Sequence, residues 1–194
     1  MALPRTKQNE KFSYADYLTW PDEDRWEIID GESYMMSPAP TRKHQGISLE
    51  LCRQFANHLK GKPCKVYDAP FDVRLAESAD ELDENTYTVV QPDIVVICNP
   101  SKLDDRGCNG APDIVLEITS PATASYDLTT KFDLYQRHGV KEYWIVLSVE
   151  QAVMVFKLQQ NGLYGQPDRY GATDKIAVTM LDEFIVDLAE VFTE

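Results

Sequence analysis

The chain has 194 residues, which is enough for one domain with a full hydrophobic core and no metal or disulfide staples. With 43% hydrophobic and 26% charged residues it is typical of a globular protein, and no apolar run approaches the roughly 18–20 residues that cross a bilayer. The net charge of −13 works against tight, nonspecific binding of duplex DNA, because that binding depends on neutralising phosphates. It does not exclude such binding, because a local groove and bound cations can override the mean charge.

The cysteines and the N-terminus bear on the cellular compartment. The four cysteines form no CxxC pair and no spacing typical of a disulfide framework. Cys98 stands in an apolar strand and is interpreted as a small core side chain. The N-terminus lacks the apolar segment of a signal peptide. We therefore expect a reduced, cytoplasmic protein without a membrane partner.

The first elements in chain order are a short helix and a hairpin. Residues 1–11 are polar and expected to be flexible. Ser13 suits the N-cap of a helix that covers residues 12–18. Asp30-Gly31 between alternating apolar residues predicts a β-hairpin over residues 26–36.

A long helix and a bent strand follow. Apolar residues at every fourth position predict a helix over 43–60, and Gly61 suits its C-terminal end. His44 lies at the centre of the apolar face of this helix. Residues 64–75 are strand-like with a bend in the middle, and residues 77–85 form an acidic, solvated turn region.

The centre of the chain alternates buried strands with a loop and a helix. We expect strands over 89–98, 113–119 and 141–149, because each is an apolar run of the length typical of a buried strand. Residues 99–110 are expected to form a loop. A helix is predicted over 126–138 and is closed by Gly139.

The tail is predicted to contain short strands over 153–158 and 175–181, with turns at 161–162 and 170–171. Residues 184–192 form a final amphipathic stretch. No repeat or linker divides the chain. The sequence therefore predicts a single α/β domain over residues 1–194.

Two of the buried strands carry acidic residues. Glu117 shares a strand face with Asp113 and Val115, so its carboxylate needs a partner, a hydrogen bond or a metal. Asp113 lies about 13 Å from Glu117 along the strand, too far to share one small ion. Asp93 comes from a different strand and could approach Glu117, so we prefer the pair Asp93–Glu117.

Lys131 lies within the apolar stripe of the following helix. Such a lysine either extends its ammonium to water or points at a buried anion, for which Glu117 is available. Several alternatives remain open. Glu117 could form a purely structural salt bridge with Lys131 or Arg74, His44 could be a satisfied core histidine, and Asp127 could be a carboxylate favoured by the helix dipole. Asp113 is expected to be structural.

These residues belong to longer segments that occur in a distinctive order. The segments are Trp26-Glu-Ile-Ile-Asp-Gly-Glu32, Met36-Ser-Pro-Ala-Pro40 with His44, Pro92-Asp93, Pro112-Asp-Ile-Val-Leu-Glu117 with Ser120-Pro121, Asp127 with Lys131 and Tyr135, and Gly139-Val-Lys-Glu-Tyr-Trp144. Together they resemble the Uma-two family of restriction-endonuclease-like proteins over roughly residues 14–190. The resemblance implies the fold of the PD-(D/E)XK nuclease superfamily: a mixed central sheet flanked by helices, here with an added N-terminal hairpin and C-terminal strands.

The resemblance also assigns residues to motifs. Asp93 matches the aspartate of the Pro-Asp motif, and Glu117 matches the acidic residue of the Glu-x-Lys motif. The lysine position of that motif is Thr119 in this chain, and Lys131, one helix later, looks like the relocated lysine. His44 matches a helix position that faces the site. Glu32 is a weaker candidate of the same kind.

The resulting hypothesis is an endonuclease or phosphodiesterase that acts on DNA and depends on Mg²⁺, with Mn²⁺ as an alternative. The proposed metal ligands are Asp93, Glu117 and the carbonyl oxygen of Ile118. Lys131 would orient the attacking water or stabilise developing charge, and His44 or Glu32 would position a second water.

Two other functions remain open: a catalytically idle nuclease scaffold that serves in binding, and a hydrolase of small phosphate esters. The Trp- and Tyr-rich N-terminal hairpin predicts a homodimer by analogy with other nuclease folds.

Overall fold

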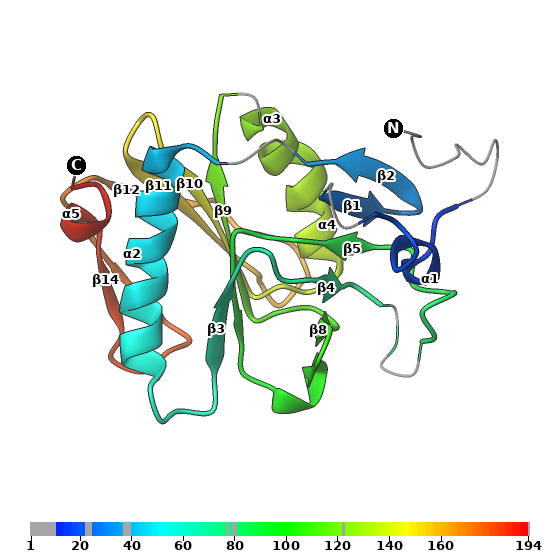
Figure 1. Ribbon diagram of the computed structural model, residues 1–194. Helices are drawn as coiled ribbons and strands as arrows, with labels where there is room; N and C mark the ends of the chain where they lie inside the picture. The colour runs from blue at the N-terminus through cyan, green and yellow to red at the C-terminus, as the bar shows by residue number, and fades with distance from the viewer. Residues whose placement is uncertain are drawn as a thin grey trace.

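The computed structural model describes residues 11–21, 25–36, 40–76, 78, 81–121 and 123–193. Its centre is a mixed sheet of six strands in the order β12-β11-β10-β9-β6-β3, called the main sheet below. A second six-stranded sheet has the order β2-β1-β5-β4-β8-β7, and β13 and β14 form a separate ribbon. Figure 1 shows α2 on one side of β9, and α3 and α4 on the other. The expected mixed central sheet, with an added hairpin and C-terminal strands, is confirmed.

The elements have the following bounds. The main sheet consists of β3 (Lys65–Asp68), β6 (Ile94–Ile97), β9 (Ile114–Thr119), β10 (Glu142–Leu147), β11 (Ala152–Lys157) and β12 (Asp168–Gly171). The second sheet consists of β1 (Trp26–Ile29), β2 (Glu32–Met35), β4 (Val73–Arg74), β5 (Val89–Val90), β7 (Leu103–Asp104) and β8 (Gly107–Asn109). The ribbon is β13 (Lys175–Ala177) with β14 (Ile185–Asp187). The helices are α1 (Tyr14–Tyr17), α2 (Arg42–Leu59), the 3₁₀ turn η1 (Pro100–Lys102), α3 (Ala124–Tyr126), the π-helical turn η2 (Asp127–Lys131), α4 (Phe132–Arg137) and α5 (Leu188–Val191).

Strand β9 is buried on both faces because packed layers cover the main sheet on either side. Ile114, Leu116 and Ile118 pack in the cluster that contains the apolar stripe of α2 and the C-terminal ribbon. Val115, on the opposite face, packs with Leu134 of α4 and with residues of the second sheet. Since side chains alternate along a strand, Glu117 faces the layer that α4 and the second sheet form.

Helix α2 lies within one residue of its predicted bounds at each end. The side chain of Thr41 caps it by accepting a hydrogen bond from the His44 amide at 3.2 Å. Its apolar stripe is buried: Ile47, Leu51, Phe55 and Leu59. Gly61 follows the helix with a φ of +79°, a left-handed conformation that favours glycine, as the sequence predicted.

Three segments differ from the sequence prediction. Residues 89–98 do not form one strand. The strand conformation is interrupted after β5, which belongs to the second sheet, and resumes at β6, which belongs to the main sheet. Residues 99–110 are not a loop, since they contain η1 and the hairpin of β7 and β8. Residues 170–171 lie in β12, which pairs with β11, and not in a turn. These strands have two to four residues each, so their identity depends on pairing partners more than on local apolar runs.

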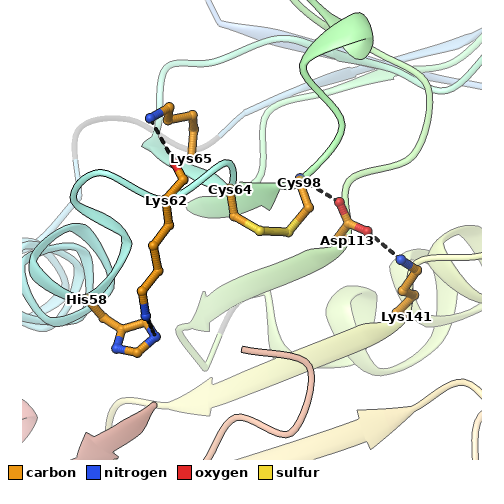
Figure 2. The surroundings of a disulfide bond; sticks show 7 residues. All are labelled: His58, Lys62, Cys64, Lys65, Cys98, Asp113 and Lys141. Atoms are coloured by element: carbon orange, nitrogen blue, oxygen red, sulfur yellow. Dashed lines mark hydrogen bonds and ion pairs between the residues drawn. A yellow bond between two sulfur atoms is a disulfide. The ribbon is translucent and has the colours of Figure 1, made fainter. Parts of the chain in front are cut away.

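A disulfide joins Cys64 and Cys98 (Figure 2). Strands β3 and β6 are antiparallel with Lys65 opposite Ile97, so the residues that flank this pair are neighbours. Cys98 packs against the core as predicted, but it is bonded to Cys64, so the expectation of a fully reduced protein is wrong. The cysteines are 34 residues apart along the chain, and that spacing carries no sign of their pairing. A cytoplasmic location stays a prediction.

Two expectations concern segments that the structure describes only in part. Of residues 1–11, only Lys11 lies among the described residues. The expectation that this segment is flexible therefore concerns residues outside the described part of the chain. In the acidic segment 77–85, residue 78 and residues 81–85 are described. Within the described part of the chain, no helix has the length and apolar character needed to cross a membrane.

Candidate active site

A cleft of about 860 Å³ lies at one end of the main sheet. At this end, β9 finishes at Thr119, β10 finishes just before Ser148, and β6 begins just after Asp93. The first turns of α2 form one wall, with Thr41 and His44, and strand β2 contributes to the opposite side. Figure 1 shows the start of α2 and helix α3 at the same end of β9.

Lys131 is buried in this cleft between two glutamates. Its ammonium Nζ lies 2.9 Å from Glu117 Oε1 and 3.0 Å from Glu27 Oε1. The Tyr135 hydroxyl also donates to Glu117 Oε1, at 2.7 Å. The backbone amide of Gln91 also donates to Glu27 Oε1, at 3.0 Å. The lysine does not extend to water, because only 4% of it is exposed.

The pKa values of Glu117 and Lys131 depend on different balances between burial and neighbouring charge. Burial raises the pKa of Glu117 to about 8, and the nearby Lys131 only partly opposes this. Burial also disfavours the charged form of Lys131, but Glu117 and Glu27 outweigh it and raise the pKa of Lys131 well above its usual value. Lys131 is therefore a permanent cation at neutral pH, held between Glu117 and Glu27.

Asp93 lies beside Glu117 and forms a second polar unit. The register of β6 and β9 sets Ile94 opposite Leu116, so the residue before β6 stands next to Glu117. The Asp93 Oδ2 atom accepts the backbone amide of Ile118 at 2.7 Å and lies 3.2 Å from His44 Nε2. Burial lowers the pKa of His44, but the hydrogen bond and charge of Asp93 outweigh it and raise that pKa overall.

Asp127, the first residue of the π-helical turn η2, also lines the cleft and is buried. Burial raises its pKa to about 6, against the opposing effect of Lys131. The interpretation of Asp127 as a carboxylate favoured by the helix dipole stays a prediction.

The structure brings together five of the six residues that the sequence singled out. Asp93, Glu117, Ile118, Lys131 and His44 all line the cleft. Glu32 does not, because it is exposed at the start of β2 and accepts a hydrogen bond from Tyr34 at 3.0 Å. Hairpin geometry explains the difference, since Glu32 pairs with Ile29 next to the turn, at the far end of β2 from Met35, a cleft residue.

Two other interpretations are resolved by contacts. Arg74 pairs with Asp104 at 2.6 Å, and Glu117 takes Lys131 as its cation. Asp113 accepts the Cys98 amide at 2.7 Å and pairs with Lys141 at 2.7 Å, a structural role seen in Figure 2.

Glu27 is the main site residue that the sequence reasoning missed. It belongs to the segment Trp26-Glu-Ile-Ile, in which a glutamate stands within a run of buried residues. That pattern is the same signal that drew attention to Glu117, namely a charge in an apolar strand. Tyr135 was placed in the same helix stripe as Lys131 and in the family resemblance, but its contact with Glu117 depends on the packing of α4 against β9.

The donors in the cleft suit a hard divalent cation of the Mg²⁺ type. Asp93 and Glu117 supply carboxylate oxygens, and both hydrogen bonds that the structure gives to the Glu117 side chain end on the same atom, Oε1. Among the described residues, no three His, Cys, Asp or Glu side chains lie close enough to hold a metal by themselves. Mg²⁺ commonly binds one or two carboxylates and completes its shell with waters and substrate phosphate, so this donor set fits. The Ile118 carbonyl as a ligand stays a prediction.

Comparison with known proteins places this geometry in a family. The family described as "Putative restriction endonuclease", Uma2, matches residues 14–189. The chain belongs to the Uma2 family. This confirms the resemblance drawn from the sequence segments.

Two relatives extend the comparison. The Uma2 chain described here is 28% identical over 155 residues to the uncharacterized protein slr1290 of Synechocystis sp., which covers 78% of this chain and 77% of that protein. A crystal structure of a "putative nuclease belonging to DUF820" from Anabaena variabilis matches with a TM-score of 0.72 at 19% identity, over 93% of this chain and 97% of that one. At that identity the second match shows the shared fold, and the expected nuclease-like α/β class is confirmed.

Proposed function

We propose that this Uma2 protein is a divalent-metal-dependent phosphodiesterase that acts on DNA through Asp93, Glu117 and Lys131. The observation that carries the proposal is the meeting of these side chains at one cleft, from β9, the start of β6 and the turn η2. The lysine of the Glu-x-Lys motif is absent from β9, yet the Lys131 ammonium reaches Glu117 at 2.9 Å from another element.

Each residue has a role that follows from its contacts. Asp93 and Glu117 would hold Mg²⁺ or Mn²⁺, with the Ile118 carbonyl as a further oxygen ligand. The ion, when bound, lowers the pKa of a coordinated water and neutralises charge on the phosphate. Lys131 supplies a fixed positive charge beside Glu117, where charge develops on the phosphate oxygens. His44 orients the Asp93 carboxylate through the 3.2 Å contact at Oδ2.

The test is cleavage of labelled single-stranded and duplex oligonucleotides in Mg²⁺, in Mn²⁺ and in EDTA. Asp93→Asn and Glu117→Gln keep side-chain shape and remove the carboxylate charge. We expect each to lower the rate at least about a hundredfold. Asp168→Asn is the matched control, because Asp168 is exposed on the edge strand β12 and pairs only with Lys157 at 2.9 Å among the described residues.

An unchanged rate in Asp93→Asn and Glu117→Gln contradicts the assignment of the site. Absence of cleavage of either DNA form by the wild type, with both metals, contradicts the proposed function itself.

A specific observation favours a second candidate, the catalytically idle scaffold. Lys131 is already shared by two glutamates, as in a purely structural ion-pair cluster, and the net charge is −13. Calorimetric titration with Mg²⁺ separates the two functions. The nuclease binds the ion with an affinity that falls in Asp93→Asn, whereas the idle scaffold releases no heat in either protein.

A further inference from the structure

The cleft is lined by more acidic than basic side chains, which is unusual for a protein that binds duplex DNA. Among the described lining residues, two are permanent cations and five are carboxylates: Arg25 and Lys131 against Glu27, Asp68, Asp93, Glu117 and Asp127. Lys131 is already committed to Glu27 and Glu117. Duplex DNA carries two closely spaced rows of phosphates, and proteins that bind it neutralise many of them. This cleft offers one uncommitted cation, Arg25, among its described lining residues.

Large apolar side chains stand at the same cleft on opposite walls. Met35 on β2 is 63% exposed and Leu49 on α2 is 73% exposed, and both line the cleft. Tyr34 and Tyr126 line the same cleft, with their ring centres 5.6 Å apart. The Lys131 ammonium is 5.9 Å from the centre of the Tyr126 ring, so the apolar surface reaches the candidate catalytic centre.

Arg25 is fixed in place by a residue that also fixes the ion-pair cluster. Its Nε donates to Gln91 Oε1 at 2.9 Å. The Gln91 side-chain nitrogen Nε2 donates to Asp72 at 2.8 Å and to the Tyr17 hydroxyl at 3.0 Å. These two hydrogen bonds set the orientation of the Gln91 amide. The Gln91 backbone amide holds Glu27, the partner of Lys131. The guanidinium of Arg25 and the ammonium of Lys131 are therefore positioned by one residue on the same cleft.

We propose that the substrate in this cleft is a single strand of nucleic acid, with one phosphate on Arg25 and an unstacked base against Tyr34, Met35 and Leu49. The proposal rests on the proposed function and names the form of its substrate. Bases in a single strand expose their faces and bind aromatic and apolar side chains regardless of sequence, whereas those in a duplex are stacked on each other. A cleft of about 860 Å³ has the size of a small-ligand site, which suits one unstacked base with its phosphate.

The test measures binding without cleavage. Protein in EDTA is titrated into fluorescein-labelled oligothymidine and, separately, into a labelled duplex of equal length, and anisotropy is recorded. We expect the single strand to bind at least about tenfold more tightly. The double variant Met35→Ala and Leu49→Ala should lose at least about fivefold in affinity for the single strand. The control is Leu163→Ala, because Leu163 is also exposed but does not line the cleft.

A salt series isolates the phosphate contact. Arg25→Gln should flatten the slope of log affinity against log salt concentration by about 0.7, the value for one phosphate of a single strand. The double apolar variant should leave that slope unchanged, since stacking neutralises no phosphate.

Equal or tighter binding of the duplex overturns the proposal, and so does an apolar double variant that binds the single strand like the wild type. The cleavage assay distinguishes this failure from failure of the proposed function. A wild type that cuts and binds duplex DNA refutes only the single-strand inference. A wild type that neither binds nor cuts either form refutes both.

Discussion

At the scale of the residue, the cluster of Lys131 with Glu27 and Glu117 is the costliest feature of the site. Taking three charges out of water is unfavourable, and the cluster is tolerated because each charge has a partner within about 3 Å. Removing one partner leaves the others buried and uncompensated. Such clusters are weak stabilisers of a fold, so their retention fits a functional demand for a fixed cation.

The first prediction concerns this cluster. Lys131→Met should lower the free energy of unfolding by about 3–5 kcal/mol, because two buried carboxylates lose their cation. Adding Glu117→Gln to Lys131→Met should recover part of the loss, since one uncompensated charge is then gone. Urea unfolding of the wild type, both single variants and the double variant measures the coupling.

The same variants have a predictable pH dependence. Burial already raises the pKa of Glu117 in the folded protein, so its ionisation lowers stability as pH rises through that pKa. Without Lys131 the folded pKa rises further, so the loss caused by Lys131→Met should grow as the pH rises above about 8, the folded pKa of Glu117 in the wild type. A loss that is independent of pH, or fully additive single effects, contradicts a coupled ion cluster.

At the scale of the element, the hairpin of β7 and β8 joins the second sheet by pairing β8 with β4. Gly107 has a φ of +125°, and a Cβ placed there would lie 2.2 Å from the carbonyl oxygen of Asp72. The same oxygen accepts the Cys108 amide at 2.9 Å, which holds β8 against β4. A glycine is therefore required at this position by both backbone angle and contact.

The second prediction tests this hairpin. Gly107→Ala should lower the free energy of unfolding by more than about 2 kcal/mol, because the methyl group meets backbone that cannot move without breaking the β4–β8 pairing. Gly162→Ala is the matched control, with a φ of +77° and no atom within 4 Å of the added Cβ. It should cost about 1 kcal/mol. Thermal and urea unfolding compare the two, and equal losses would show that the close approach at Gly107 is absent.

At the scale of the whole molecule, the Cys64–Cys98 disulfide ties the edge strand β3 to its neighbour β6. Strand β6 begins just after Asp93 and ends just before Cys98, so the candidate site and the cross-link lie at opposite ends of one strand. Figure 2 shows that Asp113 contacts the Cys98 amide and Lys141 next to the bond.

The third prediction follows from the size of the closed loop. A cross-link across 34 residues restricts the unfolded chain, so Cys98→Ser should lower the free energy of unfolding by about 3–4 kcal/mol. The reductant dithiothreitol should lower wild-type stability similarly and leave the variant unaffected. Cys52→Ser is the control, because Cys52 is free. A wild type equally stable with and without reductant would show that the bond does not form in solution.

Assembly belongs to the same scale. The homodimer predicted from the aromatic hairpin stays a prediction, and sedimentation equilibrium measures it. In the described residues the aromatic rings of this region also contact each other, for example Trp20 with Trp26 at 5.7 Å. An aromatic composition alone therefore does not require a partner subunit.

The sequence by itself determined the elements whose local pattern is strong. Helix α2 follows from its apolar repeat and from Gly61 at its C-terminal end, and the hairpin of β1 and β2 follows from Asp30-Gly31. The pairing of Glu117 with Lys131 was also within reach, because a charge in an apolar strand and a charge in an apolar helix face each need a partner.

Only the tertiary structure decided the contacts that join residues far apart in the chain. Glu27 meets Lys131 because the second sheet packs beside the helical segment that contains η2 and α4, and Cys64 meets Cys98 because β3 and β6 are antiparallel neighbours. Glu32 leaves the cleft because hairpin register places it beside the turn. Local patterns record which face of an element is buried, but the partner across that face depends on strand order and register, which no single segment encodes.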